Sequence, residues 1–254
     1  LIFAHILGYE GKINKKELEE NPDYLMTDYI GKQGIEKSYE KELQGTHGAI
    51  RMEVDAEGKM KRALGVIDPR PGNDLLLSID ARLQKKIFDE LSLILEKTQT
   101  KTAAALAVNP RNGEVLALVS LPSFDNNNFV KGITGDDYQK IISNPDDPLF
   151  NRAISGEYPP GSTIKPLIAA AALSEGTITP ETSVSDGGAI NIGNYHFGDW
   201  KVHGTVNVRK AIAESCDIFF YSVGGGYNGV EGLGMSRMKK YENLFGLGKQ
   251  TGID

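Results

Sequence analysis

A serine and a lysine stand three residues apart in the run Tyr158-Pro159-Pro160-Gly161-Ser162-Thr163-Ile164-Lys165-Pro166, where a Pro- and Gly-rich loop leads into an apolar stretch. A serine hydroxyl is a poor nucleophile at neutral pH unless a neighbouring base removes its proton. Positions i and i+3 share one face of a helix, so an unprotonated Lys165 could take the proton of Ser162. The start of a helix also presents backbone N–H groups, which favour negative charge developing at the serine. The spacing therefore predicts a nucleophilic serine.

The Ser-x-x-Lys pattern alone is weak evidence, because it should occur about once by chance in a chain of this size. Two further copies, Ser38…Lys41 and Ser236…Lys239, lie in charged segments that are typical of solvated helix faces. Only Ser162 is preceded by chain breakers and followed by an apolar run, LIAAAAL, that would bury the helix behind it. The competing interpretation is an ordinary serine at a helix start with a surface lysine.

A second polar group, Ser215-Cys216-Asp217, lies about midway along VNVRKAIAESCDIFFYSVGG. The apolar positions 208, 211, 212, 219 and 220 predict a largely buried helix. Burying polar side chains costs a few kcal/mol unless they find partners, and a cleft that contains Ser162 and Lys165 would supply them. The alternative is a hydrogen-bonded core serine beside an exposed aspartate, and Ser123-Phe124-Asp125 repeats the pattern elsewhere.

Together these residues resemble the active-site serine penicillin-recognising enzymes, whose signature is Ser-x-x-Lys, then Ser-x-Asn or Ser-x-Asp, then Lys-Thr-Gly. The flanking segments YPPGSTIKP, NPRNGEVLALVSLPSFDNNNF and AESCDIFFYSVG are similar to the class B penicillin-binding proteins. The aspartate at 217 and the long segment between the two motifs most resemble the elongation-specific penicillin-binding protein 2 branch. The resemblance extends from about Gly8 to the last residue.

The resemblance implies a peptidoglycan D,D-transpeptidase that cross-links stem peptides during cell-wall elongation and is acylated by β-lactams. Ser162 would attack the D-alanyl-D-alanine carbonyl, and Lys165 would be the base for that step. Ser215 would pass a proton to the leaving nitrogen, while Asp217 would hold the network of Ser215 and Lys165. The backbone N–H of Ser162 would donate one hydrogen bond to the oxyanion.

No Lys-Thr-Gly or Lys-Ser-Gly occurs in the 254 residues, and Lys249-Gln250-Thr251-Gly252 has the wrong spacing. We therefore expect a chain that stops within the transpeptidase domain and that is inactive alone if the third motif is needed. Two other functions stay open. One is a β-lactamase or D,D-carboxypeptidase that uses the same serine. The other is a non-catalytic β-lactam sensor or scaffold, which would be acylated without cross-linking.

The helices and strands that we expect around these residues indicate an α+β fold. Apolar spacing predicts a helix over 81–97, followed by two buried antiparallel strands with a turn at Asn109–Gly113. A short helix is expected near Asp136–Ser143, within a long polar excursion. The resemblance implies an antiparallel sheet with a helical cluster, incomplete here, as in the penicillin-binding-protein and β-lactamase fold.

The first 70 residues predict a small α+β module. We expect a polar helix around Asn14–Glu20, an amphipathic helix within residues 26–45, a turn at Ala56–Gly58 between two strands, and an alternating strand LLLSI at 75–79. Pro69, Pro71 and Gly72 mark the best boundary. The resemblance implies that residues 1–70 belong to an N-terminal pedestal (dimerisation-like) domain and residues 71–254 to the transpeptidase domain.

Composition excludes several classes of protein. A net charge of −6 speaks against nucleic acid as the main partner, and one cysteine excludes an intrachain disulfide framework. The sequence contains no apolar run of about 18–20 residues that could span a membrane. The resemblance implies a single-pass N-terminal anchor in the cytoplasmic (inner) membrane, with this portion on the periplasmic side. It also implies cell-wall elongation partners, namely a membrane glycosyltransferase and scaffold proteins.

Possible zinc ligands gather in one stretch of the sequence, namely Asp186, His196, Asp199, His203 and Cys216. Some elongation-type relatives bind zinc beside the active site. No tight Cys/His spacing supports such a site here, so we predict no metal and no cofactor, with Cys216 as a small core residue and Trp200 as a cleft wall or core residue.

Overall fold

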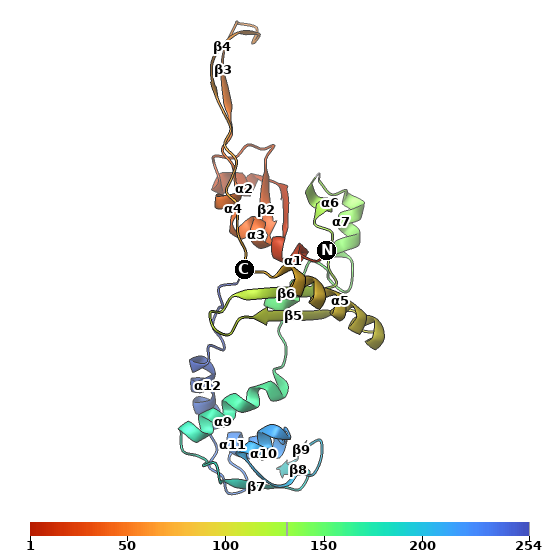
Figure 1. The fold of residues 1–254 in the computed structure, drawn as a ribbon, viewed down its shortest axis with the longest axis vertical. Coiled ribbons are helices and arrows are strands. Elements are labelled where there is room, and N and C mark those ends of the chain that lie inside the picture. The colour runs from red at the N-terminus through yellow and green to blue at the C-terminus, as the bar shows by residue number, and fades with distance from the viewer. Residues whose placement is uncertain (131, 254) are drawn as a thin grey trace. The chain divides into compact units, whose positions relative to one another are not determined.

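The computed structural model describes residues 1–130 and 132–253 (Figure 1). Within them the chain forms two compact units, one covering Leu1–Gly156 and the other Glu157–Ile253. Each unit is described below by itself. The sheets of the described residues are antiparallel strand pairs.

The first unit begins with a helix and a strand pair. Its first elements are α1 (Ala4–Leu7), β1 (Tyr9–Lys12), α2 (Lys15–Glu20), β2 (Tyr29–Gln33), α3 (Gly34–Ser38) and α4 (Glu40–Leu43). The predicted helix near 14–20 is confirmed, because Asn14 and Glu17 form a capping box at its start. The helix predicted within 26–45 is present as the two short helices α3 and α4, which follow the strand β2. Gly31 allows this arrangement, because a Cβ there would come within 2.0 Å of the Glu36 carbonyl oxygen.

A hairpin follows, formed by β3 (Ala49–Val54) and β4 (Met60–Ile67). The turn predicted at Ala56–Gly58 lies between these two strands and is confirmed. The strand predicted at 75–79 is wrong, because the part of the chain between 68 and 80 contains no strand and Leu76 is fully exposed. Alternating side chains make a strand only where a neighbouring edge pairs with the backbone. Here the backbone N–H of Asp80 donates one hydrogen bond to the carbonyl of Leu116, which does not make a strand ladder.

The rest of the first unit packs one long helix on an antiparallel pair. The helix α5 (Ala81–Thr98) is N-capped by Asp80 and packs on β6 (Val115–Leu121), which pairs with β5 (Ala103–Val108). Figure 1 shows α5 beside these two strands. The buried amide of Gln84 bonds to both the N–H and the carbonyl of Leu118, so helix and strand are joined by hydrogen bonds. The predicted helix and hairpin are confirmed. Three short helices complete the unit, namely α6 (Asn127–Val130), α7 (Gly135–Ile142), which confirms the helix expected near 136–143, and α8 (Arg152–Ser155).

The second unit is a helical cluster with two small strand pairs. Its elements are the 3-10 turn η1 (Gly161–Ile164), α9 (Lys165–Ser174), β7 (Ser183–Asp186), β8 (Ala189–Ile192), β9 (Tyr195–Gly198), β10 (Gly204–Asn207), α10 (Val208–Ala213), α11 (Asp217–Gly225) and α12 (Gly234–Leu244). β7 pairs with β10, and β8 pairs with β9.

The core of this unit lies between α9, α11 and the β7–β10 pair. α9 forms because Pro166 suits the first turn of a helix and the alanines that follow are the best helix formers. Ala171, Phe219 and Val206 are fully buried. Lys165 is the first residue of α9 and Asp217 is the first residue of α11. Packing of these two apolar helices in the core therefore positions both side chains. Among the described residues, none of the helices combines the length and the apolar character that a membrane crossing requires.

Candidate active site

The predicted nucleophile Ser162 lies in the 3-10 turn that leads directly into α9. Gly161 before it has φ of +57°, a left-handed conformation that glycine adopts without penalty. Ser162 is exposed, whereas Lys165 is only 6% exposed. The loop therefore presents a hydroxyl to a substrate in solvent while the lysine stays in the protein interior.

The ammonium group of Lys165 has three hydrogen-bond acceptors within reach. Its Nζ lies 2.8 Å from the carbonyl oxygen of Ser215, 3.0 Å from Ser215 Oγ and 2.5 Å from Asp217 Oδ1. An ammonium carries three N–H donors, so all three are used. The ring of Phe220 lies 5.6 Å from the same nitrogen. These partners compensate for the burial of the charge.

Ser215 joins the lysine to the nucleophile. Its Oγ donates to Ser162 Oγ over 2.9 Å and accepts from Lys165 Nζ. The structure therefore brings all four predicted site residues together, with Asp217 at the far end of the chain of contacts. The spacing suggested a direct contact between Ser162 and Lys165, whereas the described hydrogen bonds connect the two residues through the hydroxyl of Ser215.

The single buried helix predicted over 208–220 is wrong, because the structure has two helices there, α10 and α11, with a break in the helix between them. Ser215 has φ of +56°, a left-handed conformation that costs roughly 1–2 kcal/mol for a residue with a Cβ. Cys216 is the N-cap of α11, and its Sγ accepts from the N–H of Phe219 over 3.5 Å. The break places Asp217 in the first turn of α11, where the helix dipole favours a carboxylate. Of the apolar positions predicted to be buried, Val208, Ala211, Phe219 and Phe220 are buried, but Ile212 is 42% exposed.

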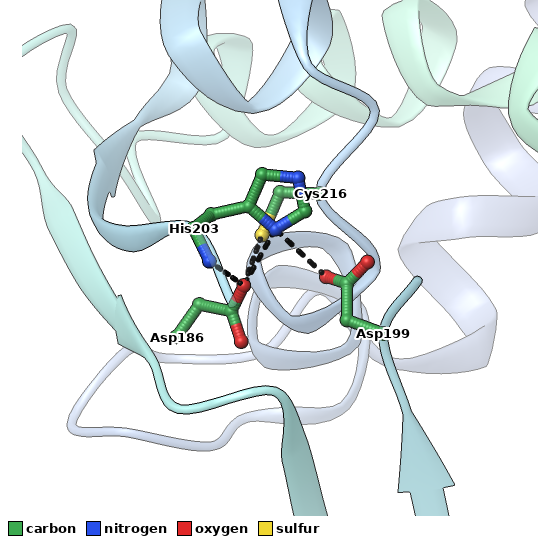
Figure 2. Close-up of side chains that lie close together, drawn as sticks. All are labelled: Asp186, Asp199, His203 and Cys216. Carbon is green, nitrogen blue, oxygen red and sulfur yellow. Dashed lines mark hydrogen bonds and ion pairs between the residues drawn. The ribbon is translucent and has the colours of Figure 1, made fainter. Parts of the chain in front are cut away.

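Four possible metal ligands converge beside this break (Figure 2). They are Asp186, Asp199, His203 and Cys216, and one ligand atom of each lies within 4.8 Å of all the others. His203 Nδ1 lies 2.6 Å from Asp186 Oδ2 and 3.5 Å from Asp199 Oδ2, and these side chains are fully buried. His196, which the sequence grouped with them, is exposed on β9 and bonds to Asn191 instead.

The chemistry of the four donors fits a zinc ion. Zinc takes thiolate sulfur, imidazole nitrogen and carboxylate oxygen in a tetrahedral arrangement. Burial acts to raise the pKa of Asp186, but hydrogen bonds from Gly188 and His203 outweigh it and hold that pKa below its usual range. Burial raises the pKa of the Cys216 thiol to about 12, so binding of a metal would release its proton. The sequence named these four residues among its possible ligands but could not show that they meet, because they come from separate elements. The prediction that there is no metal remains untested.

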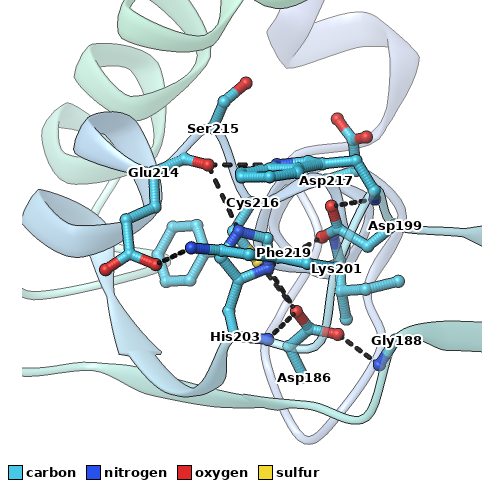
Figure 3. Close-up of polar contacts among 12 residues, drawn as sticks. Asp186, Gly188, Asp199, Lys201, His203, Glu214, Ser215, Cys216, Asp217 and Phe219 are labelled. Carbon is cyan, nitrogen blue, oxygen red and sulfur yellow. Dashed lines mark hydrogen bonds and ion pairs between the residues drawn. The ribbon is translucent and has the colours of Figure 1, made fainter.

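Three further groups surround the break (Figure 3). The carbonyl of Glu214 accepts hydrogen bonds from the imidazole Nε2 of His203 and from the indole Nε1 of Trp200, each over 3.2 Å. Lys201 lies 3.0 Å from the Glu214 carboxylate and lowers the pKa of that carboxyl group. Trp200 is 64% exposed, so of its two predicted places the core is wrong, and the cleft wall stays a prediction. Sequence patterns do not reveal the hydrogen bond of the Trp200 indole, because its acceptor is a backbone oxygen.

The other copies of the sequence patterns lie on other elements of the chain. Ser38 and Lys41 lie on α3 and α4 of the first unit, and Ser123 there bonds to the carbonyl of Leu1. Ser236 lies on α12. Of the three serines in Ser-x-x-Lys motifs, Ser162 is thus the one that the described contacts connect, through Ser215, to a buried lysine.

Sequence families match both parts of the chain. A sequence model described as "Penicillin binding protein transpeptidase domain" matches residues 103–254, and one described as "Penicillin-binding Protein dimerisation domain" matches residues 2–77. "Peptidoglycan D,D-transpeptidase MrdA" of Acinetobacter baumannii is 44% identical over 259 residues, which is 100% of this chain and 37% of that protein. The protein of the same name in Escherichia coli K12 is 41% identical and covers 99% of this chain and 39% of its own length. The chain therefore spans less than half of these curated relatives.

Solved structures agree with this likeness. A complex between penicillin-binding protein 2 and MreC of Helicobacter pylori has a TM-score of 0.82 and 35% identity, covering 98% of this chain and 44% of that one. Penicillin-binding protein 2 of Pseudomonas aeruginosa in complex with WCK 5153 has a TM-score of 0.78 and 39% identity, covering 96% of this chain and 49% of that one. These likenesses confirm the predicted α+β fold class.

Proposed function

The chain belongs to the class B penicillin-binding proteins of the penicillin-binding protein 2 type, and from this premise we propose that the protein is a peptidoglycan D,D-transpeptidase. It cross-links stem peptides during cell-wall elongation through an acyl-enzyme on Ser162, and β-lactams acylate the same serine. The observation that carries the proposal is the continuous chain of contacts from Ser162 Oγ through Ser215 Oγ to Lys165 Nζ and Asp217. The names of the relatives support the reaction.

In the proposed reaction, Ser162 Oγ attacks the carbonyl carbon of the D-alanyl-D-alanine peptide bond. Its proton moves to Ser215 Oγ, and Ser215 gives its own proton to the unprotonated amine of Lys165. When the intermediate collapses, the bond to the leaving nitrogen breaks. Ser215 gives its proton to this nitrogen and takes back the proton held on Lys165, so that Lys165 is unprotonated again. The acyl group stays on Ser162 as an ester until the amine of a second stem peptide attacks it. That attack forms the new amide and breaks the ester bond. The proton lost by the attacking amine then returns to Ser162 Oγ.

Asp217 has a holding role in this scheme. Its carboxylate lies 2.5 Å from Lys165 Nζ and keeps the lysine pointed at Ser215. The N–H of Ser162, at the start of the turn into α9, is one donor to the oxyanion. The exposed position of Ser162 lets a stem peptide or a β-lactam reach the hydroxyl.

The four-donor cluster would hold zinc if the protein binds a metal. Asp186, Asp199, His203 and Cys216 would fill all four positions of a tetrahedral ion, which is the pattern of a structural rather than a catalytic site. When bound, the ion would tie Cys216 to β7 and to the 199–203 segment. Cys216 lies between Ser215 and Asp217, so the ion would stabilise the break in the helix.

We further propose that residues 1–70 are part of the pedestal domain and that residues 71–254 are part of the transpeptidase domain. The protein would be held by a single N-terminal anchor in the cytoplasmic membrane, with these residues on the periplasmic side. Its partners would include a membrane glycosyltransferase and scaffold proteins. The Helicobacter pylori relative in complex with MreC supports a scaffold partner.

Intact-protein mass spectrometry of the full-length gene product tests the proposal. Incubation with benzylpenicillin should add one penicillin mass, and Ser162→Ala should abolish the adduct. Ser236→Ala is the matched control, because it alters another Ser-x-x-Lys motif and should leave the adduct intact. A wild-type protein that forms no adduct would overturn the proposal. An adduct lost within minutes would favour a β-lactamase, and an adduct without cross-linking of stem peptides would favour a sensor or scaffold.

A further inference from the structure

The backbone at Ser215 is held in a conformation that its own residue type disfavours. Ser215 has φ of +56° between α10 and α11, and a residue with a Cβ rarely adopts this left-handed conformation. Such a conformation persists only where the surrounding structure determines it more strongly than the local preference opposes it. The contacts that hold Ser215 are therefore part of what positions its hydroxyl.

The peptide groups on both sides of Ser215 are fixed by hydrogen bonds. The carbonyl of Ser215 accepts from Lys165 Nζ over 2.8 Å. The carbonyl of Glu214 accepts from Trp200 Nε1 and His203 Nε2, each over 3.2 Å, and Figure 3 shows Glu214 beside His203. A carbonyl oxygen has two lone pairs, and both are used at Glu214. Because the two peptide planes are fixed, the Cα of Ser215 between them is fixed as well.

The tryptophan that donates to Glu214 is itself anchored. Lys201 bonds to the Glu214 carboxylate over 3.0 Å and lies 4.7 Å from the centre of the Trp200 ring. The backbone N–H of Trp200 donates to Asp199, whose other oxygen accepts from the N–H of Ile218 in α11. Trp200 is nevertheless 64% exposed, so it contributes little to the core. What its indole does in the described structure is to donate its N–H to the backbone beside the active site.

We propose that Trp200 is a positioning residue for the acyl transfer. Its indole N–H holds the carbonyl of Glu214, and this keeps Ser215 in the left-handed conformation that points its Oγ at Ser162 Oγ. This inference rests on the proposed function, because Ser215 matters for acylation only if its hydroxyl carries the proton between Ser162 and Lys165. Trp200 acts through Ser215 and takes no proton itself.

The test is a double-mutant cycle in the full-length gene product, with benzylpenicillin as the probe. Trp200→Phe keeps an aromatic ring beside Lys201 and removes the N–H. It should slow the acylation step at saturating benzylpenicillin about 3- to 10-fold, as expected for one neutral hydrogen bond, and leave the dissociation constant of the first complex unchanged. In a Ser215→Ala background the same substitution should have no further effect, because no hydroxyl is left to position. Tyr195→Phe, at another exposed aromatic residue, is the matched control and should change neither constant.

Crystal structures of the wild type and Trp200→Phe give a readout that does not need acylation. The expected result is a Ser162 Oγ to Ser215 Oγ distance longer than 2.9 Å in the variant, with Ser215 no longer at positive φ. An unchanged backbone at Ser215 would overturn the inference, as would equal slowing in the wild-type and Ser215→Ala backgrounds. A changed dissociation constant would make Trp200 a substrate contact and would also overturn it. If the wild type is not acylated at all, the proposed function fails, and the two structures alone decide the positioning role.

Discussion

Ser215→Ala separates the proton route of the structure from the direct route suggested by the Ser-x-x-Lys spacing. Ser215 Oγ is 2.9 Å from Ser162 Oγ and 3.0 Å from Lys165 Nζ, so the substitution interrupts the relay at its middle atom. Loss of a positioned acid–base group typically slows a reaction about 10²- to 10⁴-fold. At about 1.36 kcal/mol for each factor of ten, this raises the barrier by about 2.7–5.4 kcal/mol.

The same substitution should change stability far less. Lys165 keeps the Ser215 carbonyl at 2.8 Å and Asp217 at 2.5 Å as acceptors, so its charge stays paired. Each of the two hydrogen bonds lost by Ser215 Oγ contributes about 0.5–1.5 kcal/mol to the free energy of unfolding. Because Ser162 is exposed, water can take the vacated position. The rise in the acylation barrier should therefore exceed the loss in the free energy of unfolding.

The assay is the rate constant for formation of the penicillin adduct, followed by mass spectrometry, with thermal unfolding measured in parallel. Ser222→Ala is the matched control, because Ser222 is a fully buried serine of α11 whose Oγ donates to the Ile218 carbonyl over 2.8 Å. It should lower stability by about 1–3 kcal/mol and leave the acylation rate of the folded protein unchanged. If Ser215→Ala acylates at the wild-type rate, Ser215 carries no proton and Lys165 must act on Ser162 directly.

Two further predictions concern other parts of the chain. Burial, together with the charges of Glu10 and Glu40, raises the pKa of Glu36 above its ordinary value of 4.5. Its ionised form therefore destabilises the fold at neutral pH, and this cost disappears as pH falls through the raised pKa. Glu36→Gln should accordingly raise the melting temperature at neutral pH and lose that advantage in acid. The control Glu20→Gln, at an exposed residue, should leave the melting temperature unchanged at both pH values. A gain of Glu36→Gln that persists in acid would contradict the raised pKa of Glu36. Elemental analysis of protein prepared with zinc should find about one zinc per chain, lost in Cys216→Ala and kept in His196→Ala. Chelation should then lower stability by about 2.7 kcal/mol if zinc had been present at about 100 times its dissociation constant, and a zinc-free wild type would exclude the site.

Much of the fold could be predicted because its patterns are local. The helix over 81–97 has an apolar stripe and an Asp80 cap, and the strands at 103–108 and 115–121 are short apolar runs around a turn. The strand expected at 75–79 failed for the opposite reason. Its alternation is a local pattern, but a strand also needs a paired edge, and which segments pair is decided by tertiary structure.

The chemistry-bearing residues divide in the same way. Ser162 and Lys165 could be found because their spacing is local and their flanks are distinctive. Asp186, His203 and Cys216 could be named as possible ligands from their residue types, but their convergence could not be predicted, since they come from a strand, a loop and a helix cap that only the fold brings within 4.8 Å. Trp200 was harder still. Its partner is the carbonyl of Glu214, and every residue has a carbonyl, so no sequence pattern marks that contact.

The break at Ser215 shows why an accurate apolar pattern still predicted the wrong backbone. Periodic apolar positions report which side chains are buried, and both Ala211 and Phe219 are buried as expected. They do not report whether the helix between them is continuous. In an unbroken helix, Ser215 and Asp217 would be two positions apart and would face in different directions, so a single ammonium could not contact both side chains. The left-handed Ser215 ends one helix and starts the next, and this lets Lys165 Nζ reach Ser215 Oγ at 3.0 Å and Asp217 Oδ1 at 2.5 Å. Apolar periodicity predicts a continuous helix, and this prediction is wrong at Ser215. The strained backbone of Ser215 is what brings the residues of the proposed active site together.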